Sequence, residues 1–91
     1  MRIQIIPHPE HLPIRGHCMA SGDPVMDEAV ANGIERRLIA GDIWAWCCVE
    51  VRATTADGWT KSEFLGCCSY KDEEDFRKGG YFDDMVAELS R

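Results

Sequence analysis

Residues 43–54 alternate between two kinds of side chain, which is typical of a β-strand because successive side chains of a strand point to opposite faces. One set of alternate positions is uniformly apolar: Ile43, Ala45, Cys47, Val49, Val51 and Ala53. The other set carries aromatic, thiol and polar groups: Trp44, Trp46, Cys48, Glu50, Arg52 and Thr54. This pattern predicts a strand that turns one face toward the core.

Residues 59–68 have the composition of a partner strand, and Asp57-Gly58 separates the two segments. Both central positions of a type I′ turn need positive φ, which Asp-Gly favours, so we predict a hairpin with a two-residue loop. The register that this loop sets matches charged with charged and apolar with apolar residues. The predicted pairs are Arg52–Glu63, Val51–Phe64, Val49–Gly66, Cys48–Cys67 and Cys47–Cys68.

Helical signals begin at Asp23-Pro24, where Asp23 can cap free backbone N–H groups and Pro24 suits the first turn. Apolar residues then recur at helical spacing up to Leu38, and Gly41 stands where a helix would end. The sequence therefore predicts a helix over 24–40. We interpret Gly33 within it as a site of close packing against the sheet.

Two shorter helical segments follow the hairpin. Ser69 and Asp72 resemble a capping box, and Gly79-Gly80 ends the first segment. The second, 81–90, is amphipathic. Its apolar stripe consists of Tyr81, Phe82, Met85, Val86 and Leu89. We expect the last four of these to pack on the sheet face that carries Val49, Val51 and Phe64.

The N-terminal residues 2–6 read as a short strand, and the proline- and glycine-containing segment 7–22 reads as extended and irregular. The predicted order is β-α-β-β-α-α, in one α+β domain over 1–91. We expect a three-stranded, mainly antiparallel sheet with helices packed on one face. We expect the N-terminal strand to pair antiparallel with 59–68, so that 59–68 is the central strand of the sheet. The alternative is that the N-terminal strand lies parallel to 43–54 and beside it.

Composition narrows the function. The 91 residues contain 16 acidic and 10 basic side chains, for a formal net charge of −6. Direct binding to nucleic acid or to an anionic membrane is therefore not expected, because both need a basic surface. The start of the chain does not resemble a signal peptide, and no apolar run is long enough to span a bilayer. We expect a cytoplasmic protein with mainly reduced cysteines.

Cysteines and histidines are the candidates for metal or redox chemistry. The five cysteines are Cys18, Cys47, Cys48, Cys67 and Cys68, and the histidines are His8, His11 and His17. Strand alternation sends neighbouring cysteines to opposite faces, so the favoured interpretation is packing, with a cross-strand disulfide or a His/Cys metal site as alternatives. A Cys/His nucleophilic pair lacks a recognisable third group. We expect no cofactor, no metal and no catalytic residue.

Two sets of residues are candidates for binding a partner. Trp44 and Trp46 share one predicted strand face, which must be covered either by segment 7–22 or by another chain, so a homodimer is one alternative. The C-terminal segment is rich in carboxylates, which form either a solvated surface or a surface that binds a basic partner. The candidate carboxylates are Asp72, Glu73, Glu74, Asp75, Asp83 and Asp84.

Several segments resemble a group of small phage and prophage proteins: Trp44-Ala45-Trp46-Cys47 with Val49-Glu50-Val51, Leu65-Gly66-Cys67-Cys68-Ser69-Tyr70, and Gly79 to Met85. The opening Ile6-Pro7-His8-Pro9 and the segment 19–23 are similar too. The resemblance implies a phage context, in which small acidic proteins often inhibit host defence, as anti-CRISPR proteins do. We therefore expect a non-enzymatic protein that inhibits a nucleic-acid-handling host complex such as CRISPR-Cas through its acidic surface. A phage accessory protein with a structural metal or redox-sensitive cysteine site is the alternative, and an enzyme comes third.

Overall fold

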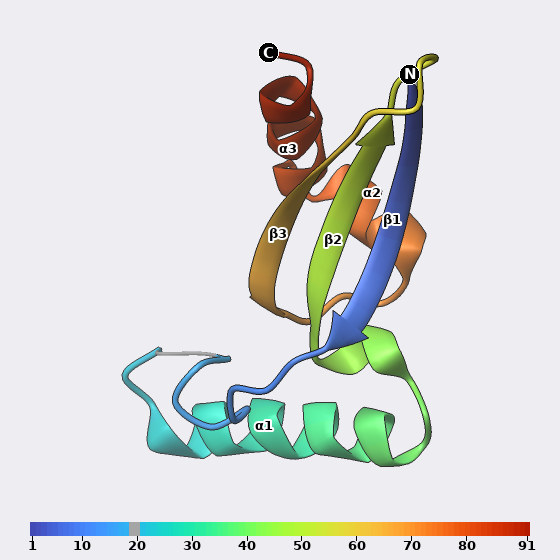
Figure 1. Cartoon of the computed structure of the whole chain (residues 1–91). Helices are drawn as coiled ribbons and strands as arrows, with labels where there is room; N and C mark the ends of the chain where they lie inside the picture. Colours follow the sequence, from blue (N-terminus) through green and yellow to red (C-terminus); the bar gives the residue numbers. More distant parts are fainter. Residues whose placement is uncertain (19–20) are drawn as a thin grey trace.

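The computed structural model describes residues 1–18 and 21–91. Its elements in chain order are β1 (Arg2–Pro9), α1 (Pro24–Ile39), the 3₁₀ turn η1 (Ile43–Ala45), β2 (Cys47–Thr54), β3 (Thr60–Cys68), α2 (Glu73–Lys78) and α3 (Tyr81–Leu89). The order β-α-β-β-α-α and the three-stranded antiparallel sheet confirm the predicted α+β class (Figure 1). Residues 19 and 20, part of the segment 19–23 included in the proposed resemblance, lie outside the described residues.

The sheet has the order β1-β2-β3, so β2 is its central strand. β1 pairs antiparallel with β2, from Arg2 opposite Thr54 to Pro9 opposite Cys47. The predicted position beside 59–68 is therefore wrong. The alternative named the correct neighbour, β2, but the wrong direction, because the pairing is antiparallel and not parallel. The physical reason is visible in Figure 1: α1 lies across the end of the sheet instead of crossing over it, so the chain re-enters β2 where it left β1.

The hairpin between β2 and β3 has a longer loop than predicted. The N–H of Thr55 donates to the carbonyl of Trp59 at 2.9 Å, and the N–H of Gly58 donates to the carbonyl of Thr55 at 3.0 Å. Gly58 has a φ of 91°, in the left-handed region. Three residues, 56–58, thus form the loop, and a glycine at its last position is typical of this turn.

The longer loop shifts the pairing of β3 by one residue. Val51 lies opposite Glu63, and the other observed pairs include Val49–Leu65 and Arg52–Ser62. The predicted pairs Val51–Phe64, Arg52–Glu63 and Val49–Gly66 are therefore wrong. A shift of one residue turns each β3 side chain to the opposite face of the sheet. Phe64 consequently points away from the core, with 61% of its surface exposed.

A bulge restores the predicted register at the far end of the hairpin. The pairing shifts between Cys47 and Val49, and Cys47 lies opposite Cys68 as predicted. Gly66 and Cys67 together face Cys48, so the predicted Cys48–Cys67 pairing is replaced by a two-to-one arrangement.

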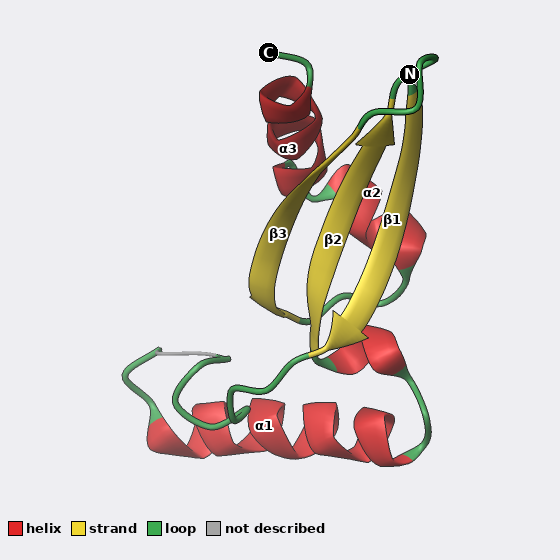
Figure 2. Cartoon of the chain, viewed as in Figure 1, coloured by secondary structure: helices red, strands yellow, loops and turns green. Residues whose placement is uncertain are grey.

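Two further corrections concern local structure. The start of the predicted strand 43–54 is the turn η1, drawn as a helix in Figure 2, because the Asp42 carboxylate accepts the N–H of Trp44 at 3.1 Å. Asp23 caps α1 as predicted. The cap of α2, however, is Asp72, whose carboxylate accepts the N–H of Asp75 at 2.9 Å, and not Ser69.

The apolar side chains form two clusters. The larger lies between the sheet and the pair α2–α3; its buried members are Cys47, Val49, Val51, Ala53, Cys68, Phe76, Met85 and Leu89. Phe82 and Val86 also pack there, so the predicted contact of α3 with Val49 and Val51 is confirmed, whereas the predicted contribution of Phe64 is wrong.

The smaller cluster joins α1 to the end of the sheet through Ile34, Ala45 and Trp46. α1 therefore packs beside η1 and not on the sheet, as Figure 1 shows. A side chain at Gly33 would meet nothing within 4 Å among the described residues, so the predicted close packing of Gly33 is wrong. The resulting molecule is elongated: its radius of gyration is 14.9 Å, against about 12 Å for a compact chain of this length.

Candidate functional site

The six predicted carboxylates lie on the two consecutive helices α2 and α3, and every one of them is exposed. We call them the acidic surface: Asp72, Glu73, Glu74, Asp75, Asp83 and Asp84. Between Lys71 and Arg91 the chain carries seven carboxylates and four basic side chains. This end of the molecule therefore has an excess of negative charge.

The carboxylates of α2 already have intramolecular partners. Asp72 caps the helix, and Asp75 accepts the backbone N–H of Lys71 at 2.9 Å. Glu73 faces Arg77 at 3.6 Å, and Glu74 faces Lys78 at 3.0 Å, in pairs one helical turn apart. Exposed pairs of this kind are weak and exchange readily with an external cation.

The carboxylates of α3 have fewer intramolecular partners than those of α2. Within the described part of the chain, Asp83 and Asp84 form no ion pair. They lie in the first turn of α3, where backbone N–H groups favour negative charge. Asp83 and Asp84 are therefore exposed and available to a cationic partner.

The two tryptophans do not share a face, because η1 interrupts the predicted strand. The ring of Trp44 lies 5.9 Å from that of Phe76, measured between centroids. Trp46 is only 3% exposed, and its indole N–H donates to the carbonyl of Leu12 at 2.8 Å. These contacts favour the interpretation that segment 7–22 and the core cover both rings.

A carboxylate that sequence analysis did not select, Glu50, is buried on the sheet face opposite α2 and α3. Glu50 is 5% exposed although no helix covers this face in the described structure. Its carboxylate accepts hydrogen bonds from Ser62 Oγ at 2.7 Å, from His8 Nε2 at 2.8 Å and from Arg52 Nε at 2.9 Å. These bonds, that of Ser62 foremost, lower the pKa of Glu50 to about 2.

The serine, histidine and glutamate of this network do not form a catalytic triad. In a triad the histidine lies between the nucleophile and the acid. Here both Ser62 and His8 donate to the same carboxylate, so His8 Nε2 is occupied by Glu50 and does not activate Ser62. The arrangement instead satisfies a buried charge and joins the three strands.

All five cysteines are free thiols. Cys47 and Cys68 are buried in the larger core cluster, and burial raises their thiol pKa values to about 12 and about 11. Burial also raises the pKa values of Cys48 and Cys67. Raised pKa values disfavour the thiolate, which is the form that attacks an electrophile or binds a metal.

His8 and His17 make contacts with different parts of the molecule. His8 binds Glu50, whereas His17 Nδ1 lies 2.9 Å from the carbonyl oxygen of Pro13. Across residues 1–18 and 21–91, no group of three or more His, Cys, Asp or Glu side chains is arranged to hold a metal ion. The geometry gives no support to the alternative of a His/Cys metal site.

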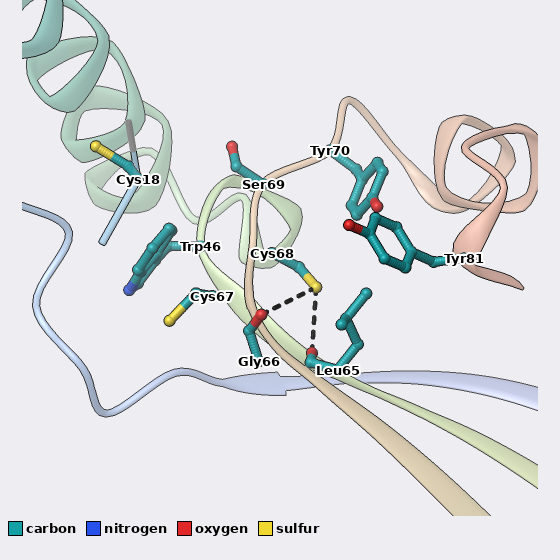
Figure 3. A pocket seen from close by; sticks show the side chains of 9 residues that line it. All are labelled: Cys18, Trp46, Leu65, Gly66, Cys67, Cys68, Ser69, Tyr70 and Tyr81. Atoms are coloured by element: carbon teal, nitrogen blue, oxygen red, sulfur yellow. Dashed lines mark hydrogen bonds between the residues drawn. The ribbon is translucent and has the colours of Figure 1, made fainter. Parts of the chain in front are cut away.

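A cavity of about 300 Å³ lies between the end of β3 and the start of α3. In Figure 3, Tyr70 and Tyr81 stand together on one side of Cys68, while Trp46 and Cys67 stand on the other. Burial raises the pKa of Tyr70. Sequence analysis missed both tyrosines as site residues, because nothing in the spacing of Tyr70 and Tyr81 shows that a bulge and a glycine pair bring them together.

Comparisons with protein-family models, with curated proteins and with solved structures find no match to this chain. The function is therefore argued from the geometry. Within the described residues, no helix is both long and apolar enough to cross a membrane.

Proposed function

We propose that this protein is a non-enzymatic binding domain that attaches to a basic surface of another protein through its acidic surface. The observation that carries the proposal is the concentration of six exposed carboxylates on α2 and α3, two of which, Asp83 and Asp84, have neither an ion pair nor a side-chain hydrogen bond among the described residues. Exposed charge of one sign attracts a partner of opposite sign and raises the rate of association.

The resemblance to phage proteins leads us to propose further that the partner is a nucleic-acid-handling complex of the host, such as CRISPR-Cas. Such a complex presents a basic surface for phosphates. A domain that occupies this surface with carboxylates would compete with the nucleic acid. Inhibition would then need no chemistry from the domain itself.

The test begins with the partner that the wild-type chain captures from host lysate, identified by mass spectrometry and then purified. Its association with the Asp83→Asn/Asp84→Asn double variant is compared with its association with Glu28→Gln/Glu35→Gln. The control also removes two exposed charges, but on α1, where both glutamates bind Arg15. The first variant should associate several-fold more slowly and the control should match wild type.

Salt provides the second arm of the test. Raising the salt concentration should slow association of the wild-type chain, because exposed charges are screened beyond a Debye length of about 10 Å at 0.1 M. Equal slowing by both double variants, or association that does not respond to salt, would contradict the proposal. Loss of binding through Trp44→Ala in a folded variant, with no salt effect, would instead locate binding at the aromatic residues.

A further inference from the structure

The cavity shares one lining residue, Tyr81, with a depression on the acidic surface. Tyr81 lines the cavity and also borders a shallow depression formed with Gly79, Gly80, Asp83 and Asp84. Tyr81 is 55% exposed, so its ring forms the boundary between the two hollows. A cationic side chain bound in the cavity would therefore lie beside the depression that Asp83 and Asp84 line.

The lining of the cavity has the chemistry of a cation site. Tyr70 and Tyr81 contribute aromatic rings on one side, and Ser69 and Gly66 contribute hydroxyl and backbone groups (Figure 3). Trp46 also borders the cavity, but its ring is almost completely buried. Aromatic faces attract cations, and carbonyl and hydroxyl oxygens accept their N–H groups. The described lining contains no lysine or arginine, so the site holds no cation of its own that would repel another.

Shape favours a guanidinium over an ammonium group. A guanidinium is planar, stacks on aromatic rings and donates several N–H bonds in one plane, whereas an ammonium is a compact and strongly hydrated point charge. The volume of about 300 Å³ exceeds that of a single side chain. The cavity thus has room for an arginine side chain, whose guanidinium can stack on the ring of Tyr81.

We propose that this cavity binds an arginine side chain of the partner, next to Asp83 and Asp84. The inference rests on the proposed function, since it names the residue that the basic partner inserts. Buried aromatic pockets at an interface commonly receive one anchoring side chain, and arginine is frequent among such anchors. The acidic surface then steers the partner, and the cavity fixes its register.

The test uses three short capped peptides, Gly-X-Gly, in which X is arginine, lysine or citrulline. Citrulline has nearly the shape of arginine but no charge. Each peptide is titrated into the full chain labelled with ¹⁵N. The arginine peptide should shift the backbone amide signals of Gly66, Ser69 and Tyr81 with millimolar affinity, the lysine peptide should bind several-fold more weakly, and citrulline should leave the signals in place.

Two variants locate the binding. Tyr81→Ala should weaken binding of the arginine peptide several-fold, whereas Tyr81→Phe should retain it, because the ring and not the hydroxyl provides the stacking surface. Circular dichroism checks that both variants fold. Equal shifts with arginine and lysine, shifts that avoid these three amides, or unchanged binding by Tyr81→Ala would overturn the inference.

The outcome is separable from that of the proposed function. Loss of partner association in Asp83→Asn/Asp84→Asn together with normal association of Tyr81→Ala would leave the acidic surface supported and the arginine site refuted. Binding of the arginine peptide at the cavity together with normal partner association of Asp83→Asn/Asp84→Asn would refute the proposed function and keep the site itself.

Discussion

The carboxylate of Glu10 accepts a hydrogen bond from the backbone N–H of Cys67, with 2.6 Å between the oxygen and the nitrogen. The same carboxylate accepts the N–H groups of His11 and Leu12 at 2.8 and 3.3 Å. Cys67 has a φ of 54°, in a region that L-residues rarely adopt, and it lies in the bulge at the end of β3. One side chain therefore ties the loop after β1 to the wall of the cavity.

We expect Glu10→Ala to lower the free energy of unfolding by about 1–3 kcal/mol, because a hydrogen bond to a charged acceptor is lost and the N–H of Cys67 is left without its partner. The contact lowers the pKa of Glu10, so its stabilising effect is present above the ordinary pKa of 4.5 and is lost as the pH falls through the lowered value. Urea denaturation measures the difference. Glu88→Ala, on the exposed side of α3, serves as the control and should change stability little.

Glu50 should cause a second and larger loss of folding stability at acid pH. Its pKa is about 2 in the folded chain and 4.5 ordinarily, so the ionised form contributes up to about 3 kcal/mol above the ordinary pKa. This contribution should disappear as the pH falls from 4.5 toward 2. In Glu50→Gln, stability should be lower at neutral pH and should fall less steeply over that interval. If the stabilities of the variant and the wild type fell equally over that interval, Glu50 would not be the group responsible for the acid dependence.

Packing on α3 and β3 can be tested with a pair of truncations. Leu89 is 5% exposed in the larger core cluster, so Leu89→Ala should cost about 2–4 kcal/mol through lost burial and a residual cavity. Phe64 is 61% exposed, so Phe64→Ala should cost less than about 1 kcal/mol. Chemical denaturation compares the two. A larger loss of stability in Phe64→Ala than in Leu89→Ala would contradict the observed register and support the one that the sequence predicted.

The cysteines should separate into two classes during alkylation of the native, reduced protein. Cys18, Cys48 and Cys67 are partly exposed and should react first. Cys47 and Cys68 are buried, with thiol pKa values of about 12 and 11, and should react only after unfolding. Mass spectrometry of peptides from a time course distinguishes the sites, and rapid labelling of Cys68 in the folded chain would contradict this assignment.

Metal content is a separate test of the cysteines. Elemental analysis of the purified protein should find no stoichiometric zinc, and a chelator should leave the unfolding transition where it was. One zinc ion per chain, lost together with the fold on chelation, would favour the alternative function with a structural metal site.

Local signals in the sequence were sufficient for the elements themselves. Asp23-Pro24 and the apolar spacing after it located α1 to within one residue, since a cap and a helical period are properties of neighbouring residues. The amphipathic segment 81–90 likewise gave α3 and the buried positions Met85 and Leu89. The charge excess at the C-terminal end was equally visible, because composition does not depend on folding.

Tertiary structure alone decided how these elements meet. Asp57-Gly58 fits a loop of two or of three residues, and the choice of three moved Phe64 from the core to the surface. The bond between Glu10 and Cys67 joins residues 57 positions apart, so no local pattern could show it. The order of the strands and the meeting of Tyr70 with Tyr81 likewise depend on which surfaces can be buried together, a balance that only the complete packing of the chain determines.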